Sequence, residues 1–140
     1  MIAIISAYQK KLSGPLLDRI DMTVCIQKVP NETLIAENTH RNIQHLAAQE
    51  MIRNATAMQR NRYGSSSKYN ANLSSKDVRK FCTLSTDCLA ILKLATDRLN
   101  LSARSYFKII KVAQTIADLT GESSITPQHL SEALQYRQTS

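Results

Sequence analysis

Residues 101–121, LSARSYFKIIKVAQTIADLTG, decide the fold class of this 140-residue chain. Their apolar side chains recur at intervals of three and four residues, a period typical of a helix with one face in a hydrophobic core. Ser102 is suited to cap the start of such a helix, and Gly121 is suited to end it. The stretch therefore predicts a long core helix whose buried face consists of Tyr106, Ile109, Ile110, Ala113, Ile116 and Ala117.

Helical signals continue on both sides of this stretch, from Pro30 onward. The chain has only three glycines and three prolines, so few residues interrupt helices. A first helix is expected to run from Asn31 to about Tyr63, with a break near Asn38. We therefore expect a mainly α protein, a bundle of about four to six helices. The expected caps of the flanking helices are Asn31, Ser74 (in a capping box with Asp77), Ser85 and Thr126, which precedes Pro127.

One segment near the N-terminus has a different pattern. Residues 22–29, MTVCIQKV, are rich in β-branched residues, alternate roughly in polarity and stop at Pro30, so they predict the one strand of the chain. A single strand cannot satisfy its own backbone hydrogen-bonding groups. The strand is therefore expected either to pair with strands in another part of the protein or to be displaced here.

Several classes of site are disfavoured by what the sequence lacks. It has no GxxxxGK[ST] loop to hold nucleotide phosphates and no GxSxG turn for a nucleophilic serine. His40 and His45 are five residues apart and so lie on different faces of a helix, and the three cysteines form no CxxC pair. No apolar run reaches the roughly 20 residues that span a bilayer. We expect no metal site, no membrane partner and a cytoplasmic location.

Arg19 is the first candidate functional residue. It lies in the segment Ser13–Asp21, SGPLLDRID, just before the predicted strand and between Asp18 and Asp21. A guanidinium presented by a neighbouring subunit can stabilise the charge that develops during phosphoryl transfer. A local salt bridge to one of the flanking acids is the alternative role.

Arg104 is the second candidate. It follows the expected cap, Ser102, by two residues and so falls in the first turn of the core helix. The positive end of a helix dipole and the free N–H groups there favour an anion, so a basic side chain at this position needs a reason. Phosphate recognition is one reason, and a salt bridge or simple solvation is another.

The formal net charge of +7 allows an acidic partner such as nucleic acid. The densest basic stretch contains Arg53, Arg60, Arg62 and Lys68, with Tyr63 and Tyr69 close to it. Basic residues interleaved with aromatic residues are typical of surfaces that bind single-stranded nucleic acid. A solvated basic surface gives the same pattern, so both interpretations stay open.

Three motifs together resemble the C-terminal third of bacterial magnesium-chelatase-like AAA+ ATPases of the ComM/YifB type. They are residues 13–21, residues 101–119 and residues 129–137, HLSEALQYR, and the similarity runs from about Tyr8 to Arg137. Gln59 with Arg62, Leu73-Ser74 and Phe81-Cys82 also stand where this family has them. The chain departs from the family at Thr56 and Met58, where arginines are usual, which weakens a role of that helix in gripping DNA.

The resemblance implies two parts and two site residues. Residues 1–30 would be the C-terminal remnant of the AAA+ ATPase core, and residues 31–140 the helical lid. Arg19 would be the arginine finger, acting in trans, and Arg104 the sensor-2 arginine, acting on the nucleotide of its own or of a neighbouring subunit.

The resemblance also implies a function. The full-length parent would bind ATP with Mg²⁺, assemble into a ring oligomer and couple hydrolysis to remodelling, with DNA as the expected substrate. The fragment alone would bind no cofactor and would not be catalytically competent. A non-enzymatic basic helical module that binds nucleic acid or a protein partner is the alternative function.

Overall fold

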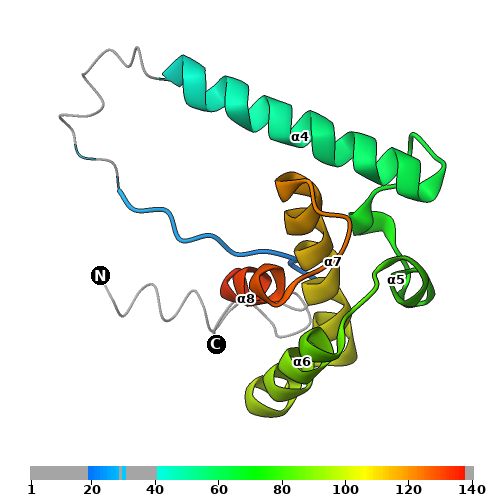
Figure 1. Cartoon of the computed structure of the whole chain (residues 1–140). Helices are drawn as coiled ribbons and strands as arrows, with labels where there is room; N and C mark the ends of the chain where they lie inside the picture. Colours follow the sequence, from blue (N-terminus) through cyan, green and yellow to red (C-terminus); the bar gives the residue numbers. More distant parts are fainter. Residues whose placement is uncertain (1–18, 29, 31–40, 138–140) are drawn as a thin grey trace.

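The helical class is confirmed by a computed structural model, which describes residues 19–28, 30 and 41–137. Five α-helices and one 3₁₀ turn follow one another in these residues (Figure 1). They are α4 (Arg41–Tyr63), the 3₁₀ turn η1 (Asn70–Asn72), α5 (Ser75–Phe81), α6 (Thr86–Leu99), α7 (Ala103–Thr120) and α8 (Pro127–Gln135).

The helix boundaries follow the capping residues that the sequence indicates. The Ser74 hydroxyl accepts a hydrogen bond from the Asp77 N–H, and the Ser85 and Ser102 hydroxyls accept from the N–H groups three residues later. Gly121 ends α7 with a φ of 79°, in the left-handed region that glycine adopts without steric cost. The predicted start of the first helix at Asn31 lies outside the described residues.

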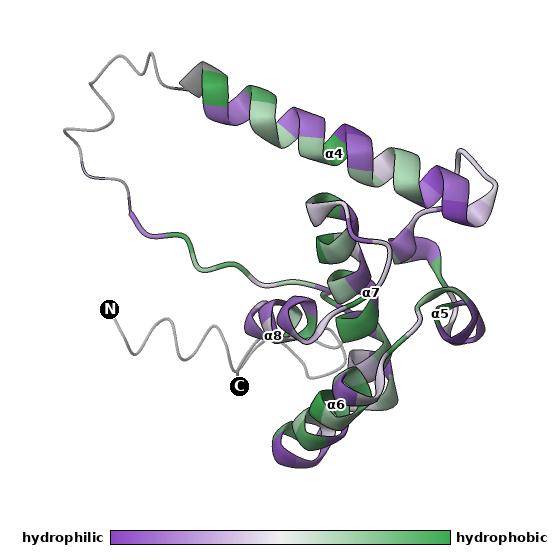
Figure 2. Ribbon diagram, in the orientation of Figure 1, coloured by the Kyte–Doolittle hydropathy of each residue, from purple (hydrophilic) through white to green (hydrophobic). Residues whose placement is uncertain are grey.

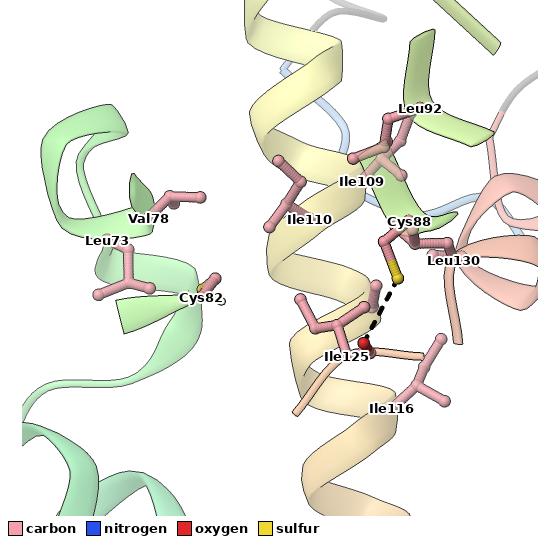
Figure 3. Close-up of a cluster of buried hydrophobic side chains, with 12 residues drawn as sticks. Leu73, Val78, Cys82, Cys88, Leu92, Ile109, Ile110, Ile116, Ile125 and Leu130 are labelled. Carbon is pink, nitrogen blue, oxygen red and sulfur yellow. Dashed lines mark hydrogen bonds between the residues drawn. The ribbon is translucent and has the colours of Figure 1, made fainter. Parts of the chain in front are cut away.

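Helix α7 is the centre of the bundle. It packs against α8, α4, α5 and η1, while α6 packs against α8 (Figure 1). Its predicted apolar face is confirmed in large part, because Ile109, Ile110 and Ile116 are buried. The core around them is completed by Leu73, Val78, Cys82, Cys88, Leu92, Ala113, Ile125, Leu130 and Ala133 (Figure 3).

The two core cysteines behave as buried apolar side chains. Cys88 is fully buried, and its thiol donates a hydrogen bond of 3.4 Å to the carbonyl of Ile125 (Figure 3). Burial raises the pKa of Cys82 to about 11. The Cys82 thiol therefore stays protonated at neutral pH.

Helix α4 is packed over only part of its length. Ala55 and Gln59 are buried, whereas every side chain described between Ile43 and Asn54 is exposed. Hydrophobic and hydrophilic residues are mixed along this helix, and its N-terminal half extends beyond α7 (Figures 1 and 2). The stability of α4 therefore depends on contacts near its C-terminal end.

The predicted strand is not formed by the residues that the structure describes. Residues 20–28 are extended but belong to no strand, and Val29 lies outside the described part. The physical reason is that a strand needs a partner, and the neighbouring elements are helices whose backbone groups are already paired. The Thr23 N–H instead donates a hydrogen bond of 2.8 Å to the carbonyl of Tyr136 at the end of α8.

Among the described helices, none combines the length and the apolar character that crossing a membrane requires.

Candidate functional site

Arg104 lies at the second position of α7, as its distance from Ser102 predicts. The hydroxyl of Ser102 accepts a hydrogen bond of 3.1 Å from the N–H of Ser105 and so fixes the start of the helix. The Arg104 side chain is exposed and forms no ion pair with any residue in the described part of the chain. It is therefore available to an anion that approaches the N-terminal end of α7.

A cavity of about 770 Å³ opens beside this end of α7. Its walls come from α5, α6 and the first turns of α7, with Ser102 and Ala103 at one side and the rings of Tyr106 and Phe107 at another. These two rings meet edge to face, with centroids 5.4 Å apart. The remaining lining residues are Val78, Arg79, Cys82, Thr83, Leu84, Leu89, Thr96, Leu101 and Ile110.

A second arginine, Arg79, lines this cavity and is not among the site residues predicted from the sequence. The guanidinium of Arg79, on α5, lies over the ring of Phe107 at 5.4 Å from the ring centroid. Phe107 is three residues after Arg104 and so is its neighbour on the surface of α7. The signal that could have identified Arg79 is its spacing from Lys76 and Lys80, which places all three on one face of a short helix.

Arg19 lies at the beginning of the extended segment and is exposed. The Lys108 ammonium donates a hydrogen bond to the carbonyl of Ile20, the next residue in the chain. Lys108 is one helical turn after Arg104, so the residue that follows Arg19 contacts α7 one turn away from Arg104. Asp18 lies outside the described residues, and Asp21 makes no ion pair with Arg19 within the described part.

Arg62, by contrast, has a structural role. Its guanidinium donates two hydrogen bonds to the fully buried carboxylate of Asp118 on α7, one of them 3.0 Å long. The paired carboxylate holds the pKa of Arg62 above its usual value. Asn70 and Gln114 also donate to Asp118, at 2.8 Å and 3.3 Å. Arg62 therefore attaches α4 to α7, and its side chain is only 14% exposed.

The positive charge of the molecule is concentrated in one region. Residues 53–80 contain seven basic residues and one acidic residue, a net charge of +6 out of +7 for the whole chain. The remaining residues are therefore almost balanced in charge.

The described residues contain no group of three or more His, Cys, Asp or Glu side chains that could hold a metal ion.

Comparisons with known proteins give consistent results. Residues 44–137 match the family described as magnesium chelatase, subunit ChlI C-terminal, and residues 2–34 match the family described as magnesium chelatase, subunit ChlI. The competence protein ComM of Haemophilus influenzae is 39% identical over 134 residues, which are 95% of this chain and 25% of that protein.

Two other relatives are less similar to the chain. The uncharacterized protein YifB of Escherichia coli is 33% identical over 136 residues, covering 93% of this chain and 25% of YifB. An uncharacterized protein of Mycobacterium tuberculosis is 32% identical over 132 residues, covering 94% of this chain and 26% of that protein. The chain thus spans about a quarter of the length of the curated relatives it matches.

Proposed function

The chain belongs to the magnesium chelatase family, in its subunit ChlI C-terminal region, and from this premise we propose that it is the helical lid of an oligomeric AAA+ ATPase. In this proposal residues 1–30 are the last part of the ATPase core and residues 31–140 are the lid. The helical bundle around α7 supports the second assignment.

Arg19 and Arg104 are proposed to contact the γ-phosphate region of ATP in the assembled ring. Arg19 acts as the arginine finger of a neighbouring subunit, and Arg104 acts as the sensor-2 residue. The observation that carries this proposal is the exposure of both side chains beside the same turns of α7, where the Lys108–Ile20 contact links the two segments. A guanidinium fork suits phosphate oxygens and stays charged at every physiological pH.

The residues of this chain fit only one part of a bound nucleotide, its terminal phosphate oxygens. ATP and Mg²⁺ would supply the phosphoryl group and a counter-charge for it, and this chain contains neither a phosphate loop nor paired acids on a strand end. What the lid itself does is to present Arg104 from a rigid helix. The ATPase would use the response of the lid to the bound nucleotide to remodel its substrate. We propose that this substrate is DNA.

The test is Arg19→Ala in the full-length ATPase that contains this chain. Removing an arginine finger costs on the order of 10³–10⁵ in turnover, while nucleotide binding should stay largely intact because other residues hold the nucleotide. Steady-state hydrolysis and equilibrium binding of a fluorescent ATP analogue measure the two quantities. Arg98→Ala, an exposed arginine on α6, is the matched control. Normal turnover of the Arg19 variant would refute the finger assignment.

A non-enzymatic module that binds nucleic acid is the second candidate function. The concentration of net charge in residues 53–80 favours it. Hydrolysis distinguishes the two candidates, because a binding module has no turnover that Arg19→Ala could abolish.

A further inference from the structure

The outer face of α5 consists of cations. Lys76, Arg79 and Lys80 are all exposed and stand at positions i, i+3 and i+4, which lie side by side on a helix. Val78, on the opposite side of the helix, is 2% exposed and packs in the core. The burial of Val78 therefore fixes which face of α5 points to solvent, and that face carries three positive charges.

This face continues onto the neighbouring elements. Arg79 reaches α7 through the ring of Phe107, and the Lys111 ammonium of α7 donates a hydrogen bond of 3.2 Å to the carbonyl of Ala71 in η1. Lys68, in the loop before η1, lies 5.5 Å from the ring centroid of Phe81 at the end of α5. We define the α5 basic face as Lys68, Lys76, Arg79, Lys80 and Lys111.

One acidic side chain of the segment lies close to this face. The Asp77 carboxylate is 3.4 Å from the Lys68 ammonium and also accepts hydrogen bonds from Ser74 in the capping box. Asp77 therefore offsets the charge of Lys68 and leaves the three α5 cations unpaired within the described residues. By comparison, α6 carries Lys93 and Arg98 together with Asp87 and Asp97, so its surface charge is balanced.

We infer that the α5 basic face binds the phosphodiester backbone of DNA without reading its sequence. The choice of DNA rests on the proposed function, whereas the location rests on the geometry of α5. Contacts mainly to phosphate are expected because cations already cover the rings of Phe81 and Phe107. Lys80 lies 5.0 Å from the ring centroid of Phe81, and Arg79 covers Phe107.

A lipid surface fits this face less well than DNA does. Helices that bind membranes combine cations with large apolar side chains that enter the bilayer. The exposed large hydrophobic residues described in this structure lie on α4, on α6 and in residues 20–26, and Tyr69 is the one near the α5 basic face.

The experiment measures binding of the 140-residue chain to a short labelled DNA duplex by fluorescence anisotropy between about 50 and 200 mM salt. The variant K76Q/R79Q/K80Q should bind at least about tenfold more weakly at low salt. Its slope of log affinity against log salt should be smaller by about 2 to 3, because each lost phosphate contact removes about 0.9 from the slope. The matched control is K28Q/K93Q/R98Q, which removes the same charge from other exposed sites and should bind nearly as the parent does.

The inference is overturned if both triple variants lose the same affinity, if the α5 variant binds as the parent does, or if the parent shows no binding at low salt. Binding to anionic vesicles in place of DNA would also overturn it. The charge-conserving variant K76R/R79K/K80R should restore binding, which separates a charge effect from a folding defect. Since Arg19→Ala should leave DNA affinity unchanged, failure of this inference is distinguishable from failure of the proposed ATPase function.

Discussion

At the scale of single residues, Asp118 is the polar centre of the fold. Its side chain is fully buried and accepts hydrogen bonds from Arg62, Asn70 and Gln114, which come from α4, η1 and α7. Removing one member of a buried ion pair is more costly than the net contribution of the pair, because the other charge stays buried without compensation. Asp118 is therefore expected to be a position where a conservative substitution is strongly destabilising.

We expect Asp118→Asn to lower the free energy of unfolding by about 3–5 kcal/mol. The substitution keeps the shape of the side chain but removes the charge that pairs with Arg62, whose side chain is only 14% exposed. Urea unfolding followed by circular dichroism measures the change. Asp97→Asn, at an exposed site on α6, serves as control and should change stability by less than about 0.5 kcal/mol. Equal effects of the two substitutions would contradict the role assigned to the buried pair.

This pair also shows what the sequence could not reveal at the residue scale. Arg62 and Asp118 are 56 residues apart, and no local spacing or period connects them. From the sequence, Arg62 belongs to the densest basic stretch and is a candidate contact for nucleic acid. Its actual partner is determined by how α4 crosses α7, which depends on tertiary packing.

At the scale of elements, most helix ends could be predicted because they depend on local chemistry. The capping residues Ser74, Ser85 and Ser102 and the stop at Gly121 are all confirmed. The strand predicted for residues 22–29 is not formed over the described residues 22–28, because a strand depends on partners far away in sequence. Local signals therefore predicted the helices, and the missing strand shows where they were insufficient.

The capping box of α5 predicts a pH dependence. Hydrogen bonds from the side chain and backbone of Ser74, and then the nearby Lys68, hold the pKa of Asp77 below its usual 3.8. A lowered pKa means that folding favours the charged form of Asp77. The contribution of this charge to the stability of the fold is therefore present above pH 3.8 and is lost as the pH falls through the folded-state pKa. The unsubstituted chain should therefore be more stable at neutral pH than the Asp77→Asn variant.

Thermal unfolding of both proteins from neutral pH down to below the pKa of Asp77 tests this expectation. The difference in melting temperature should be constant above about pH 5 and should shrink below pH 3.8. Asp87→Asn in the first turn of α6 is the control for a helix-dipole effect without a Lys68 partner. A difference that does not change down to the lowest pH would show that the Asp77 charge does not contribute.

At the scale of the whole molecule, the bundle around α7 contrasts with the N-terminal segment. Within the described chain, the backbone of residues 20–28 makes two hydrogen bonds: the Thr23 N–H donates to the Tyr136 carbonyl, and the Ile20 carbonyl accepts from the Lys108 ammonium. Its remaining backbone groups face no partner among the described residues. The motifs single out Arg19 and Arg104, but the contact between their segments, from Lys108 to the Ile20 carbonyl, could not be predicted, because it depends on how this segment lies along α7.

The same segment predicts how the isolated chain behaves at high concentration. Ile20, Met22, Val24 and Ile26 alternate along it and are 42%, 45%, 61% and 89% exposed. An extended segment with unpaired backbone groups and one apolar side pairs readily with a second copy. We expect the chain to self-associate as its concentration rises, and Val24→Lys/Ile26→Lys to prevent this without changing the melting temperature, because neither side chain is buried.

Size-exclusion chromatography with light scattering over a concentration series measures this association. The control is Ile43→Lys on α4, where the side chain is 75% exposed but the backbone is paired within a helix. If association depends on free backbone groups beside apolar side chains, Ile43→Lys should associate as the parent does. Should Ile43→Lys abolish association while Val24→Lys/Ile26→Lys leaves it intact, the contact would run through the exposed half of α4, and the extended segment would have no part in it.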